Sequence, residues 1–133
     1  MIETNVTYIK SLKVALQAGL VSAGVNIAWL YSTVYALGIT GLPKGFPIAV
    51  VFSSILPLLL GALVYVTLVK NFKQGAYLFM ILAFGFALFS VFPSFQPLLP
   101  DGSKAPLNFA LLTVPMHFVV AVIGIYYLIK RNS

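Results

Sequence analysis

The chain has 133 residues, of which 61% are hydrophobic and only 8% are charged, with a mean hydropathy of +1.05 and a formal net charge of +6. A soluble domain carries about 25% charged residues, so this composition excludes an ordinary soluble protein. The absence of cysteine excludes thiol–disulfide chemistry, cysteine-ligated zinc and iron–sulfur clusters.

Four long stretches of the sequence contain no Asp, Glu, Lys or Arg, and they lie at residues 14–37, 46–69, 76–98 and 108–129. A helix rises about 1.5 Å per residue, so each stretch can cross the roughly 30 Å of hydrocarbon in a bilayer. The loops between them are short, which places consecutive helices side by side. We therefore predict an all-α, four-transmembrane-helix antiparallel bundle that forms one domain over residues 1–133.

The first segment, 14–37, is rich in small residues at helical spacing. They form three rows: Ala15, Gly19 and Ala23; Gly24, Ala28 and Ser32; and Ala18, Ser22 and Asn26. Helices in lipid associate through close packing and hydrogen bonds, so small residues mark helix–helix interfaces. We expect this helix to be the most enclosed of the four.

The third segment, 76–98, is unusual in its phenylalanines, which surround Gly85 and Ser90. They are Phe84, Phe86, Phe89, Phe92 and Phe95. We interpret these side chains as facing lipid or filling the core, and we keep a ligand-binding aromatic box as the less favoured alternative.

Three of the four segments contain a proline, at Pro57, Pro93 and Pro115. A proline inside a helix removes one backbone N–H and loosens the carbonyl four residues earlier. We therefore expect kinks at these three positions. A freed carbonyl in a membrane has to find a partner or line a wet cavity.

The basic residues predict the orientation of the chain. Six of them precede the first segment, separate the second from the third or follow the fourth, and only Lys44 and Lys104 lie on the other side. The positive-inside rule then predicts that both termini face the cytoplasm, in what we expect to be a bacterial inner membrane. We expect the six to contact anionic lipid headgroups rather than nucleic acid: Lys10, Lys13, Lys70, Lys73, Lys130 and Arg131.

Each segment also offers polar side chains at a similar depth, roughly 18 Å from the predicted cytoplasmic ends. The residues of this layer are Asn26, Ser54, Ser90 and His117, and together with Ser22 and Thr113, each one helical turn away, they make up the candidate site. The single histidine, His117, is expected either to hydrogen-bond Asn26, Ser22, Thr113 or a free carbonyl, or to bind a ligand. Because no carboxylate lies within any segment, we predict no catalytic residues, no metal site and no cofactor.

The order of these features resembles a known family. Asn26 lies in a small-residue first helix, Tyr31, Tyr35 and Leu37-Gly38 follow, a proline comes after Ile55-Leu56, and a Ser90…Pro93 element, Met116-His117 and a basic tail complete the pattern. The chain resembles a bacterial family of small four-helix integral membrane proteins classed as a domain of unknown function. The resemblance implies the fold and no particular activity.

Two functional hypotheses follow from the sequence. The first is a non-enzymatic accessory or structural subunit that acts through helix–helix contacts in an oligomer or a larger complex. The alternative is a small-molecule, lipid or ion binder or transporter with an outward-facing cavity around Asn26 and His117.

Overall fold

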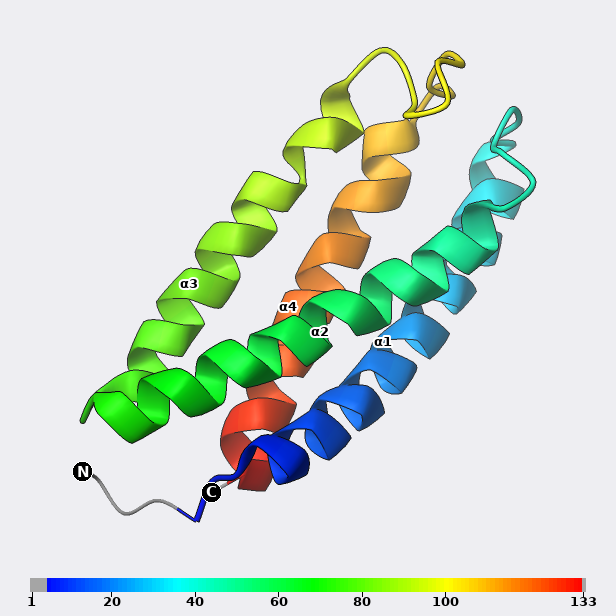
Figure 1. Ribbon diagram of the computed structural model, residues 1–133. Coiled ribbons are helices and arrows are strands. Elements are labelled where there is room, and N and C mark those ends of the chain that lie inside the picture. The colour runs from blue at the N-terminus through cyan, green and yellow to red at the C-terminus, as the bar shows by residue number, and fades with distance from the viewer. Residues whose placement is uncertain (1–4, 133) are drawn as a thin grey trace.

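The computed structural model describes residues 5–132 and is all-helical, with four long helices (Figure 1). They are α1 (Tyr8–Leu37), α2 (Phe46–Asn71), α3 (Gly75–Ser90) and α4 (Phe109–Asn132), with a short 3-10 helix, η1 (Phe92–Phe95), after α3. All four spans are long and apolar enough to cross a membrane, with the third counted through η1 to Phe95. The predicted helical class is confirmed.

The helices differ from the predicted segments mainly at their ends. α1 begins at Tyr8, six residues before the predicted start, because Thr7 caps it by accepting a hydrogen bond from the backbone N–H of Lys10 at 3.2 Å. α4 continues through its basic residues to Asn132. Charged residues end a run of apolar sequence, but they do not end a helix.

The prediction of one continuous helix over 76–98, kinked at Pro93, is wrong. α3 ends at Ser90, and Pro93 lies in η1, where Ser94 N–H bonds the Val91 carbonyl at 3.0 Å. Proline disfavours helical backbone at the residue before it and cannot donate to the residue four positions earlier, so the helix stops instead of bending. Pro57 and Pro115 do lie inside α2 and α4.

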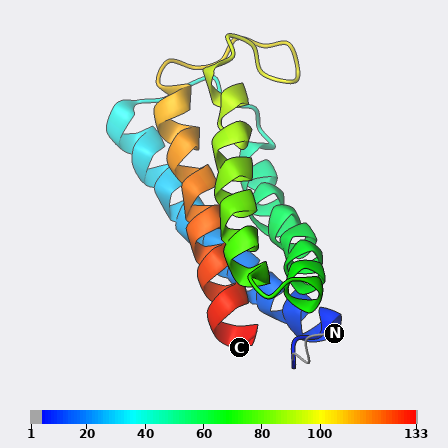
Figure 2. The same cartoon turned by 90° about the vertical axis from the view of Figure 1, so that its left-hand side faces the viewer.

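The four helices lie side by side in two views of the molecule (Figures 1 and 2). The connections α1–α2 and η1–α4 lie at one end, and the α2–α3 turn, the start of α1 and the end of α4 lie at the other. α1 packs against α2 and α4, and α3 packs against the same two helices; α1 and α3 do not touch within residues 5–132.

Burial is concentrated on α1, as predicted, with ten buried residues against three on α3. Close approach explains part of this: a Cβ added at Gly19 would lie 2.9 Å from the backbone Cα of Ile55 on α2. Gly124 on α4 likewise leaves room for the Leu58 side chain. The glycines therefore set how closely α1, α2 and α4 approach one another.

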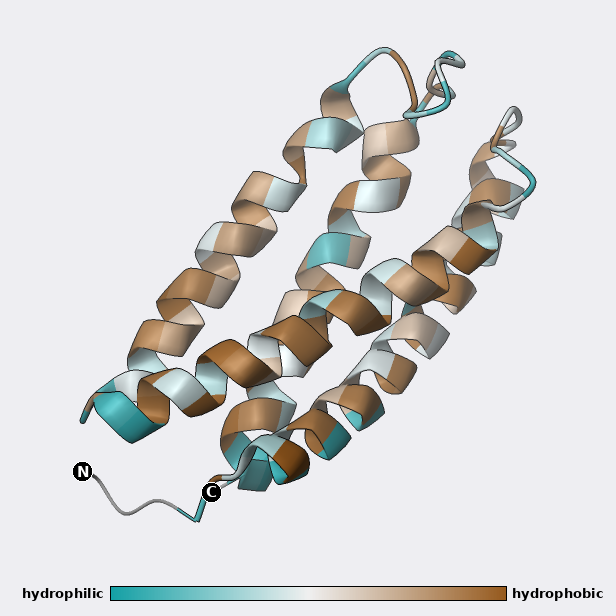
Figure 3. Ribbon diagram, in the orientation of Figure 1, coloured by the Kyte–Doolittle hydropathy of each residue, from teal (hydrophilic) through white to brown (hydrophobic). Residues whose placement is uncertain are grey.

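The outside of the bundle is apolar along the helices, and the polar residues lie mainly towards their ends and in the connections (Figure 3). Phe79 is buried in the core, at 4% exposure, but the other five phenylalanines of the third segment belong to this outer surface. Their side chains are exposed in the isolated chain, from 42% at Phe84 to 78% at Phe89. They therefore face outwards and do not fill the core.

The η1–α4 connection contains a turn closed by Asp101. Its carboxylate accepts hydrogen bonds from the Ser103 hydroxyl at 2.6 Å and the Ser103 N–H at 3.0 Å. These two bonds, the hydroxyl first, hold the pKa of Asp101 below its ordinary value.

We expect the turn to lose this stabilisation as the pH falls. The folded pKa of Asp101 lies below its unfolded value, so the stabilisation is present above the unfolded value of about 3.9 and disappears as the pH drops through the folded pKa. Ser103→Ala should raise the pKa of Asp101. An NMR titration of the Asp101 carboxyl carbon checks this, and an unchanged midpoint in the variant would contradict it.

The glycine contacts predict opposite effects for one substitution at two places on α1. Gly19→Ala should lower the free energy of unfolding by about 1–3 kcal/mol, because the new methyl group meets the α2 backbone. Gly24→Ala should raise it by about 0.5–1 kcal/mol, because nothing lies within 4 Å of the added Cβ and alanine favours the helix. Unfolding in mixed detergent micelles measures the free energy of unfolding of both variants. Equal changes in the two variants would contradict the close contact of Gly19 with α2 and the open space beside Gly24.

Candidate functional site

Asn26 occupies the centre of the predicted polar layer and is only 1% exposed. Its side-chain nitrogen donates to Ser54 Oγ on α2 at 3.0 Å and to the Met116 carbonyl on α4 at 3.3 Å. The Ser54 hydroxyl in turn donates to the Val50 carbonyl at 2.7 Å. One amide group therefore joins three helices.

Trp29 adds a second bond between α1 and α4. Its indole N–H donates to the Leu112 carbonyl at 2.8 Å. The sequence reasoning missed this residue. The available signal was its spacing, since Trp29 lies three residues after Asn26, on the same face of α1 as Asn26.

His117 and Thr113 connect α4 to α3 and η1. His117 Nδ1 lies 3.1 Å from Ser90 Oγ, and Thr113 Oγ1 lies 2.7 Å from Ser94 Oγ. Ser94 was also missed, although it lies four residues after Ser90 just as Thr113 lies four before His117. The two bonds therefore lie about one helical turn apart along the contact of α4 with α3 and η1.

The expectation that Asn26, Ser22, Thr113 or a free carbonyl partners His117 is wrong. Neighbouring helical residues point about 100° apart, so Met116 and His117 face different helices. Met116 packs in the core with Leu30 and Leu112, while His117 is directed to Ser90 on α3.

Ser22 lies one turn from Asn26 and is fully buried, yet it takes no part in these bonds. Its hydroxyl oxygen and the Asn26 side-chain oxygen are both enclosed and have no hydrogen-bond partner within residues 5–132. The predicted layer is thus two separate sets of contacts, one around Asn26 and one around His117.

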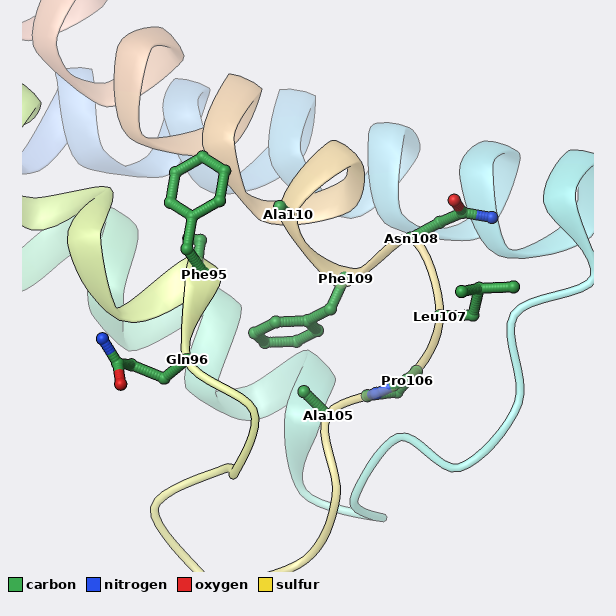
Figure 4. Close-up of a pocket in the computed structure, with 9 residues that line it drawn as sticks. Phe95, Gln96, Ala105, Pro106, Leu107, Asn108, Phe109 and Ala110 are labelled. Atoms are coloured by element: carbon green, nitrogen blue, oxygen red, sulfur yellow. The ribbon is translucent and has the colours of Figure 1, made fainter.

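A surface pocket of about 380 Å³ lies where η1 meets the start of α4 (Figure 4). The Phe109 ring projects between the two chain segments, while the side chains of Gln96 and Asn108 point away from it. A second pocket, of about 240 Å³, lies along α2. Neither is lined by Asn26 or His117. The first is lined by Ser94, Phe95, Gln96, Ala105, Pro106, Leu107, Asn108, Phe109 and Ala110, and the second by Leu63, Val64, Thr67 and Leu68.

Basic side chains make defined contacts at the opposite end of the bundle. Lys10 Nζ donates to the Asn132 carbonyl at 3.3 Å, and Arg131 donates to Gln17 Oε1 at 3.2 Å while its guanidinium lies 4.7 Å from the centroid of the Tyr127 ring. None of these partners is a carboxylate, so the positive charges remain available to anionic groups outside the chain.

No cluster of three or more histidine, cysteine or acidic side chains able to hold a metal occurs within residues 5–132. Comparisons with family models, with curated proteins and with solved structures find no match for this chain. The family resemblance of the sequence therefore stays a prediction.

We predict a measurable coupling between Asn26 and Ser54. In a double-mutant cycle of Asn26→Ala and Ser54→Ala, the coupling free energy should be about 0.6 kcal/mol and at most about 1.7 kcal/mol, the range found for hydrogen bonds within membrane bundles.

The matched control pairs Asn26→Ala with Ser90→Ala. Ser90 bonds His117 and not Asn26, so these two effects on the unfolding free energy should add. Equal coupling in both cycles would contradict the separation of the two contact sets.

Proposed function

We propose that this chain is an integral membrane protein whose four helices form an antiparallel bundle with both termini on the cytoplasmic side. Two residue pairs support antiparallel directions for α1 and α4, because Ser11 bonds Asn132 whereas Trp29 bonds Leu112. The excess of basic residues at the end that holds both termini supports the orientation.

We further propose a non-enzymatic accessory or structural role, exercised through helix–helix contacts in an oligomer or a larger complex. The observation that carries this proposal is the second small-residue row of α1. Gly24, Ala28 and Ser32 are exposed in the isolated chain, although the neighbouring row containing Gly19 packs against α2. A row of small residues lets a further helix approach closely.

The polar groups within the spans also favour a structural role. Asn26, Trp29, His117 and Thr113 each bond another helix or η1, so much of the polar chemistry is used in holding the bundle together. A binder or transporter with an outward-facing cavity around Asn26 and His117 has less support, because Asn26 is enclosed and neither described pocket includes either residue.

In this proposal the protein needs no cofactor and catalyses no reaction. Its partners are the bilayer, other copies or other membrane subunits, and anionic lipid headgroups at its cytoplasmic end. The residues proposed to meet those headgroups are Lys10, Lys13, Lys70, Lys73, Lys130 and Arg131.

The α1 row gives a direct test of the accessory role. Gly24→Leu should dissociate the native assembly, because its side chain would separate the approaching helices, without lowering the stability of the monomer. Gly85→Leu on α3 is the matched control, since nothing lies within 4 Å of a Cβ at either glycine.

Native mass spectrometry from lipid nanodiscs and from native membrane extracts gives the mass of the particle. We expect a particle heavier than one chain for the wild type and Gly85→Leu, and a single chain for Gly24→Leu. The proposal would be overturned if the wild-type particle always has the mass of one chain, or if Gly24→Leu leaves the mass of the assembly unchanged.

A further inference from the structure

The second pocket lies on the outward side of α2, close to the end of that helix. Its volume is about 240 Å³, and it is lined by Leu63, Val64, Thr67 and Leu68. Three of these four side chains are aliphatic, and Leu63 and Val64 are 41% and 44% exposed. The pocket is therefore an apolar hollow on the surface that the proposed placement turns towards lipid.

A cation lies beside this pocket. The Tyr8 hydroxyl at the start of α1 lies 3.3 Å from Thr67 Oγ1, which belongs to the pocket lining. The ammonium nitrogen of Lys70 lies 5.1 Å from the centroid of the Tyr8 ring. Thr67 and Lys70 are three residues apart on α2, so their side chains are neighbours on the surface of that helix. These contacts hold the positive charge next to the pocket.

The charge of Lys70 has no acidic partner within residues 5–132. The single acidic residue in that part of the chain, Asp101, lies in the η1–α4 connection, at the other end of the bundle. A lysine ammonium group carries three N–H donors, and its contact with the face of a ring uses none of them fully. Lys70 can therefore bind an anionic group from outside the chain while it stays beside Tyr8.

Exposed apolar side chains continue from the pocket along the same face of α2. Leu56 and Leu60 are 52% and 65% exposed, and they precede Val64 by eight and four residues, so the three follow one line along the helix. Leu56 and Leu68 are twelve residues apart, which corresponds to about 18 Å along the helix. This length is slightly more than half of the roughly 30 Å of hydrocarbon in a bilayer, so the apolar line spans about one leaflet.

We propose that this surface of α2 binds one anionic phospholipid from the leaflet on the cytoplasmic side. Lys70 binds the phosphate, and one acyl chain lies in the pocket and along Leu60 and Leu56. The cation, the pocket and the apolar line follow one another in the order of the headgroup and chain of a lipid in that leaflet. A lipid with a net negative charge fits better than a zwitterionic one, because its headgroup brings no cation of its own to Lys70. The inference rests on the membrane placement and orientation proposed above, but not on the accessory role.

Native mass spectrometry of the full chain released from lipid nanodiscs shows which lipids stay bound. The nanodiscs contain equal amounts of phosphatidylglycerol and phosphatidylcholine with the same acyl chains, so the two probes differ only in the headgroup. We expect the wild-type chain to retain one phosphatidylglycerol in preference to phosphatidylcholine.

Substitutions of lysine test the headgroup half of the site. Lys70→Gln should lower the preference for phosphatidylglycerol by about fivefold, the effect of one lysine near an anionic surface, and Lys70→Arg should keep it. Lys104→Gln is the matched control, because it removes the same charge at the opposite end of the bundle and should leave the preference unchanged.

Substitutions of valine test the acyl-chain half. Val64→Trp should reduce the retention of both lipids, because the new ring occupies the pocket. Val122→Trp is the matched control, since Val122 is similarly exposed, at 53%, but lies on α4 outside the pocket. It should retain lipid as the wild type does.

The proposal is overturned if the wild type retains the two lipids equally, if Lys70→Gln leaves the preference unchanged, or if Val64→Trp and Val122→Trp retain lipid alike. An equal loss of preference in Lys70→Gln and Lys73→Gln would also overturn the site, but it would leave the proposed contacts between the basic end and headgroups standing. Failure of the chain to insert into nanodiscs would contradict the membrane placement itself, so the two failures are distinguishable.

Discussion

The arrangement of the bundle depends on the amide of Asn26. Within hydrocarbon, a polar group has no water to bond, so it must find partners in the protein. Asn26 finds two for its nitrogen, Ser54 on α2 and the Met116 carbonyl on α4. Both bonds form only when the three helices have one particular register, and the close approach of Gly19 to Ile55 brings α1 near enough to α2 for this. Packing by small residues and polar bonding thus favour the same arrangement.

α3 is held differently and more lightly. At one end Gly75 lies against the backbone of Leu68 and Val69, and the Tyr65 and Phe79 rings meet edge to face at 5.2 Å between centroids. At the other end the bonds of Ser90 and Ser94 connect it and η1 to α4. Between these attachments most of the helix faces outwards.

The sequence predicts the architecture well, because an apolar run of 22 to 24 residues without any charge is typical of a helix that crosses a bilayer. The depths of the residues also predict that Asn26 and Ser54 lie in one layer, and the two side chains are hydrogen-bonded. The sequence does not predict the end of α3, since a proline at position 93 is compatible with both a kink and a stop. The sequence pattern does not give the rotation of each helix about its own axis. Met116 and His117, for example, lie at nearly the same depth but face different helices. For the same reason the sequence could not tell which row of α1 packs inside, the one with Gly19 or the one with Gly24.

The central claim, that the polar layer at Asn26 is enclosed within the bundle, is tested most directly by hydrogen exchange of side-chain amides. Residues Gln96 and Asn108 are exposed and serve as references within the same sample. In lipid nanodiscs placed in D₂O, the Asn26 amide protons should persist long after those of Gln96 and Asn108 have exchanged. Exchange of Asn26 as fast as the two references would show that water reaches the layer, and would contradict the account.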